Sequence, residues 1–266
     1  VIISIVLLTT MKTYDDESDG IEPKVMQILF PLLGSICGLS TIGVIYYQAS
    51  NSGHLLPDMI TPPISLLGCQ SPEHRTYQIG FAITGLILFL SVKAWKDIFF
   101  PEFLKVTPTS CRLVLFGGFL SSIGCIGQGI VTLDDDFMFR VQSKQPVSYQ
   151  SLLHQWFAMS FFLGAAIHCY STIFMCFGPK SAEHIYSTNS FLVKLCCIAP
   201  SFFAWPLAEA LHPINDQVYT TQRRVNVGGV AQYITVISYI LFFGSYSLDF
   251  LNKKMEKQNQ RLGKEN

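Results

Sequence analysis

The charged residues of this chain gather between long apolar runs, and this pattern restricts the fold more than any other feature. Only 14% of the 266 residues are Asp, Glu, Lys or Arg, whereas a soluble domain carries about a quarter. A helix needs about 20 mostly apolar residues to cross a bilayer. We predict six such helices, at residues 27–47, 77–95, 113–133, 152–177, 191–211 and 228–248.

The predicted fold is therefore all-α, a polytopic membrane bundle of about six transmembrane helices. Residues 1–26 are predicted to be a cytosolic segment, 27–248 the transmembrane domain and 249–266 a basic cytosolic tail. Lys and Arg prefer the cytosolic side of short loops. Most of them, Lys194 included, fall on that side when both termini are cytosolic. The formal net charge of zero argues against nucleic acid as a partner.

Ionisable residues gather at the helix ends predicted to face away from the cytosol. His154 opens the fourth helix, and Glu209 and His212 close the fifth. An ionisable group in the bilayer is costly unless it is paired or hydrated, so these three are the catalytic candidates if the protein modifies lipids. The alternative is an ordinary polar layer at the lipid headgroups. No HExxH, GxSxG or P-loop motif occurs in the sequence, and we expect neither a metal nor a cofactor.

Prolines and small residues predict how the helices bend and pack. Pro200 and Pro206 each remove a backbone donor from the fifth helix, which predicts a kink. The third helix is rich in Gly and Ser, including Gly117 and Gly124, and small residues let membrane helices approach closely. That approach can serve packing within the bundle or the contact surface of a homodimer.

The loop between the first two helices carries the most informative motif. Asp58 lies in a proline-rich stretch, followed by Ile64, Ser65 and Gly68, and then by Pro72, Glu73 and Arg75 at the start of the second helix. Together with His154 at the fourth helix, this pattern resembles the Frag/DRAM/Sfk family. That family of six-helix membrane proteins includes damage-regulated autophagy modulators, the post-GPI-attachment factor and the N-terminal part of Cwh-type proteins. The resemblance spans about residues 27–248, although Leu66 stands where many members have Asp.

The resemblance implies a role in GPI-anchor remodelling, in lipid arrangement or in autophagy. Our first hypothesis is a non-enzymatic membrane factor whose loop, Asp58 to Arg75, faces lipid headgroups. The alternatives are a lipid acyltransferase or hydrolase and a structural subunit of a larger complex. The expected partners are membrane lipids, GPI-anchored proteins or other membrane subunits. The expected location is the Golgi, endoplasmic reticulum, lysosome or plasma membrane.

Overall fold

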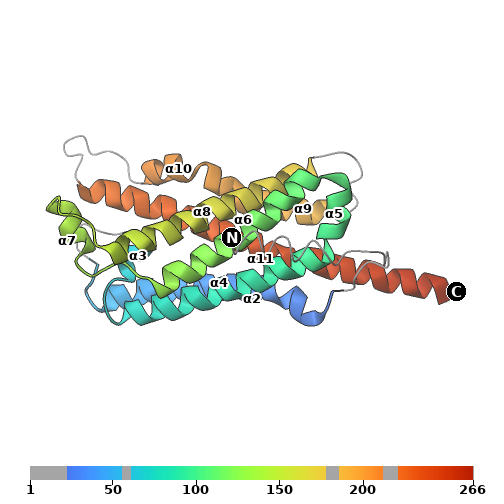
Figure 1. Ribbon diagram of the computed structural model, residues 1–266, viewed down its shortest axis with the longest axis horizontal. Coiled ribbons are helices and arrows are strands. Elements are labelled where there is room, and N and C mark those ends of the chain that lie inside the picture. Colours follow the sequence, from blue (N-terminus) through green and yellow to red (C-terminus); the bar gives the residue numbers. More distant parts are fainter. Residues whose placement is uncertain (1–22, 56–60, 178–185, 212–220, 266) are drawn as a thin grey trace.

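The computed structural model describes residues 23–55, 61–177, 186–211 and 221–265, which form α-helices with no strand among them (Figure 1). Five helices are long and apolar enough to cross a membrane: α2 (Val25–Asn51), α4 (Glu73–Ile98), α6 (Pro108–Ile130), α8 (Tyr149–Cys176) and α11 (Thr221–Glu265). The bent pair α9 (Thr188–Phe202) and α10 (Ala204–Leu211) supplies a sixth span if it is counted as one. The prediction of an all-α membrane protein with about six helices is confirmed.

The long helices run side by side as an elongated bundle (Figure 1). Helix α11 packs against α2 and α9, and the order continues from α2 through α4 and α6 to α8. Two short helices, α3 (Ile64–Leu67) and α7 (Phe137–Gln142), lie at one end, and α5 (Phe100–Val106) lies at the other. We call these the α3 end and the α5 end. That the α3 end faces away from the cytosol stays a prediction.

The small residues of α6 bring its backbone into contact with α8. A Cβ atom added at Gly124 would lie 2.4 Å from the backbone nitrogen of Phe161, and one added at Gly164 would lie 2.4 Å from that of Ser121. Neither position has room for a side chain, because backbone atoms occupy the space. These glycines therefore serve packing within the chain, and a homodimer remains a prediction.

The span predicted as one helix at residues 191–211 is divided. Helices α9 and α10 meet at an angle of 60° around Phe203, between Pro200 and Pro206. Pro200 lies inside α9 and has no N–H to donate to the preceding turn, which weakens the helix just before the break.

Helix α11 extends beyond residue 248, where we expected the membrane domain to end. It continues to Glu265, so the basic tail prolongs the helix and projects past the α5 end (Figure 1). Asp249 and Phe250 are buried. The core of the bundle therefore includes the first residues that we had assigned to the tail.

Candidate functional site

The segment before α4 is tied to α11 by side-chain amides. The backbone N–H of Thr61 donates to Asn226 Oδ1 at 3.0 Å, and that of Ile64 donates to Gln232 Oε1 at 2.8 Å. Both amides belong to α11, which is more than 160 residues away in the sequence. The bond to Gln232 satisfies the first backbone donor of α3, and the two bonds together tie α3 and the chain before it to α11.

Gly68 ends α3 in close contact with Tyr77 of α4. A Cβ atom at this position would lie 2.5 Å from the ring of Tyr77, so any side chain would push α3 away from the bundle. Tyr77 is itself buried. The carbonyl of Gly68 lies 3.1 Å from His74 Nδ1, and this contact closes the turn between α3 and α4.

Glu73 at the start of α4 is fully buried and paired with His54, which follows α2. The Nδ1 atom of His54 lies 3.0 and 3.1 Å from the two carboxylate oxygens, and the side chains are 29% and 0% exposed for His54 and Glu73. A carboxylate in the first turn also complements the positive end of the helix dipole. The pair therefore joins the end of α2 to the beginning of α4.

The residues that we expected to face lipid headgroups differ in burial, and that this loop faces headgroups stays a prediction. Three of them are buried within the protein: Ile64, Gly68 and Glu73. These residues therefore lie inside the α3 end and not on its surface. Ser65 is half-buried, whereas Pro72 and Arg75 are exposed. Asp58 lies outside the described residues.

Beside this motif, a cavity of about 360 Å³ opens between α3 and α7. Its polar lining comes from His54, Cys69, Gln70, Asp135 and Gln142, and its apolar lining includes Leu66 and Met138. Burial, reinforced by the nearby carboxylates of Asp135 and Asp134, raises the pKa of the Cys69 thiol to about 12. Cys69 therefore stays protonated at neutral pH, and the cavity offers amides and a carboxylate to a polar ligand.

The three aspartates at residues 134–136 have different roles. Asp134 accepts hydrogen bonds from the hydroxyls of Ser148 and Ser151 at the start of α8. Asp136 pairs with Arg140 at 2.7 Å, one turn along α7. Asp135 is the member of this run that lines the cavity.

His154 lies inside the bundle, where it bonds α8 to α6. It is 2% exposed, and its Nδ1–H donates to the carbonyl of Val131 at 2.6 Å. Its Nε2 atom is buried without a hydrogen-bond partner. His168 repeats this geometry deeper in α8: its Nδ1–H donates to Val114 at 2.8 Å, and its Nε2 also lacks a partner. The repetition indicates that both histidines hold α8 against α6.

The structure does not assemble the three catalytic candidates into one described site. Helix α10, which carries Glu209, packs against α11 and α9, whereas His154 contacts α6 and lies near Tyr77 of α4. His212 lies outside the described residues. Within the described part of the chain, no group of three His, Cys, Asp or Glu side chains is arranged to hold a metal ion.

A comparison with known protein families identifies the family of this chain. The model for the Frag1/DRAM/Sfk1/Cwh43P N-terminal domain matches residues 25–253. The chain belongs to this family. The match covers α2 to α10, with the short helix α3 and its supporting contacts among them, and α11 as far as Lys253. No curated protein and no solved structure matches the chain significantly.

This member of the Frag1/DRAM/Sfk1/Cwh43P family also has a buried ion pair that our sequence reasoning missed. Lys194 of α9 pairs with Asp249 of α11, and both side chains are 0% exposed. Ser190 bonds to both charged groups, and the Lys194 ammonium lies 4.5 Å from the ring centre of Tyr246 and 5.0 Å from that of Tyr186. Lys194 is therefore not a flanking charge of the cytosolic side, as we had counted it. Its position inside an apolar run was the available signal.

Proposed function

We propose that this membrane protein is a non-enzymatic factor in lipid or GPI-anchor handling, which holds a polar lipid headgroup in the cavity at the α3 end. The cavity between α3 and α7 carries this proposal. The level at which membrane helices begin and end is the level of the headgroup layer, and the cavity lies where α2 ends and α4 begins. We expect this activity in the endomembrane system or at the plasma membrane.

The lining of the cavity suits hydroxyl and ammonium groups. The carboxylate of Asp135 accepts hydrogen bonds, and the amides of Gln70 and Gln142 both donate and accept them. Sugar and inositol hydroxyls need such mixed partners, and an ethanolamine ammonium needs an acceptor. The volume, about 360 Å³, falls within the range of small-molecule sites, about 300–1,000 Å³.

Complementation in cells that lack the gene tests this proposal. The readout is the lipid composition of GPI anchors and of membrane phospholipids, measured by mass spectrometry. Asp135→Leu removes the carboxylate from the cavity and should fail to restore the wild-type composition. Asp136→Leu is the matched control, because Asp136 pairs with Arg140 on α7, and it should complement.

Two results would contradict the proposal. One is full complementation by Asp135→Leu at the same protein level as the wild type. The other is an unchanged lipid composition, in GPI anchors and phospholipids alike, when the gene is deleted.

One observation favours a second candidate, a lipid-modifying enzyme. Donation by Nδ1–H of His154 to Val131 leaves Nε2 as an unprotonated nitrogen without a partner, and this is the state that a general base requires. Alanine substitution of His154, Glu209 and His212, with lipid turnover as the readout, distinguishes the candidates. Unchanged turnover in all three variants excludes the enzyme, whereas loss in any one that keeps its fold would favour it.

A further inference from the structure

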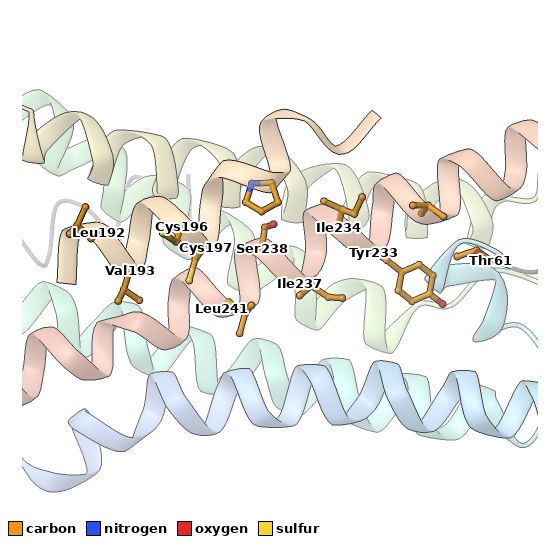
Figure 2. A pocket seen from close by; sticks show the side chains of 12 residues that line it. Thr61, Leu192, Val193, Cys196, Cys197, Tyr233, Ile234, Ile237, Ser238 and Leu241 are labelled. Atoms are coloured by element: carbon orange, nitrogen blue, oxygen red, sulfur yellow. The ribbon is translucent and has the colours of Figure 1, made fainter. Parts of the chain in front are cut away.

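A second and larger cavity lies on the side of the bundle, between α9 and α11 (Figure 2). Its volume is about 650 Å³. Val193, Cys197 and Pro200 line it from α9, and Ile234, Ile237 and Leu241 line it from α11. Both helices belong to candidate membrane spans, so this apolar groove lies at the depth of the lipid hydrocarbon.

The break between α9 and α10 lies beside the groove. The chain bends by 60° at Phe203, and both α9 and α10 contact α11. The walls next to the bend are small, with Pro200 on one side and Ser238 on the other. The rim is apolar and exposed, as shown by Leu192 at 50% and Leu241 at 41%.

The dimensions of the groove fit one hydrocarbon chain. From Val230 to Leu241, its wall along α11 extends roughly 16 Å at about 1.5 Å per residue. This is close to half of the hydrocarbon core of a bilayer, which is about 30 Å thick, and so to the depth of one leaflet. A helix of about 10 Å diameter and the same length would fill about twice the volume of the groove. The shape therefore favours an acyl chain over a partner helix.

The end of the groove nearest α3 offers a polar group. Tyr233 lines this end together with Thr61, and its hydroxyl is buried without a hydrogen-bond partner (Figure 2). A buried hydroxyl is costly unless it is hydrogen-bonded. The ester carbonyl that joins an acyl chain to glycerol is an acceptor, and it lies at the same depth, just below the headgroup.

We propose that the groove between α9 and α11 binds one acyl chain of a membrane phospholipid. The chain lies along α11 from Tyr233 toward Leu241, and its ester carbonyl accepts a hydrogen bond from the Tyr233 hydroxyl. This site is separate from the headgroup cavity between α3 and α7, and its test does not depend on the function proposed above.

Photocrosslinking of the full-length protein tests the proposal. The protein is reconstituted into phosphatidylcholine vesicles that contain a small fraction of phosphatidylcholine with a diazirine in one acyl chain. After irradiation, crosslinked peptides are quantified by mass spectrometry. We expect crosslinks to concentrate on residues 230–241, and a diazirine placed farther along the acyl chain should shift them toward Leu241.

Variants that fill the groove supply the control. Ile237→Trp should lower crosslinking at residues 230–241 at least fivefold, and Val193→Trp, from the opposite wall, should do the same if the first variant does not fold. Leu86→Trp, at an exposed position of α4, should leave it unchanged. Tyr233→Phe should lower it about two- to tenfold, as expected for loss of one hydrogen bond.

Three outcomes would overturn the proposal. Equal crosslinking at α4 and in the groove would show ordinary surrounding lipid only. Unchanged crosslinking in a folded Ile237→Trp or Val193→Trp variant would show that the chain lies elsewhere. If size-exclusion chromatography detects a dimer in which the groove peptides are protected from crosslinking, the groove is the contact surface for a second copy of the protein.

Discussion

The buried pair of Lys194 and Asp249 holds α9 against α11, and its removal should be costly. Lys194→Met keeps a long side chain but removes the charge, so that Ser190 becomes the remaining hydrogen-bond partner of the Asp249 carboxylate. Removing one member of a buried ion pair leaves the other charge uncompensated, at a cost of about 3–5 kcal/mol. We expect Lys194→Met to destabilise the protein by that amount.

Removing the charge of Asp249 should cost less than removing that of Lys194, because Lys194 has other partners. In Asp249→Asn the ammonium keeps the Ser190 hydroxyl at 3.1 Å and the rings of Tyr246 and Tyr186 at 4.5 and 5.0 Å. A desolvated cation over an aromatic ring gains about 2 kcal/mol. We therefore expect Asp249→Asn to be about 2 kcal/mol less destabilising than Lys194→Met.

Thermal unfolding in mild detergent measures this difference, with the fraction that stays monodisperse on size-exclusion chromatography as the readout. For a chain of this size, 1 kcal/mol shifts the melting temperature by about 2–4 °C, so Lys194→Met should lower it by about 6–20 °C. The matched control is Lys254→Met, on α11 beyond Asp249, which should change the melting temperature by about 2 °C or less.

A double variant completes the test. Replacing both charges, in Lys194→Met with Asp249→Leu, should restore much of the stability, because two apolar side chains leave no buried charge unpaired. The reasoning is refuted if Lys194→Met melts within about 2 °C of the wild type. It is also refuted if the double variant loses as much as the two single variants together.

Two further predictions concern the α3 end. Gly68→Ala should destabilise the protein by about 1–3 kcal/mol in the same thermal assay, because its Cβ would lie 2.5 Å from the Tyr77 ring. The control Gly43→Ala, whose Cβ would have nothing within 4 Å, should not destabilise the protein. Equal stability of the two variants would contradict the contact. The pKa of the Cys69 thiol is raised from 9.0 to about 12, so Cys69 should react with iodoacetamide at pH 8 about a thousandfold more slowly in the folded than in the unfolded protein, as measured by peptide mass spectrometry. Asp135→Asn should speed the reaction of the folded protein. A folded-state rate equal to the unfolded-state rate would refute the shift.

The sequence by itself determined the fold class and the family. The length of an apolar run decides whether a helix can cross a bilayer, and this is a local property. The predicted span 77–95 therefore falls within α4, and the predicted span 152–177 lies within α8 except for its last residue. The short motif from Ile64 to Glu73, together with His154, indicated the family. The sequence also indicated a disturbance near Pro200, because the missing N–H of proline is equally local.

Only the tertiary structure decided which way the polar side chains face and what they contact. Glu73 is turned inward onto His54, and His154 donates to a carbonyl of α6. Lys194 pairs with Asp249, which lies 55 residues away in the sequence. A charge at the end of an apolar run can reach headgroups or the bundle interior, and its helical position alone does not choose between them. The packing of neighbouring helices decides, because a buried charge is tolerated only where another element brings its partner.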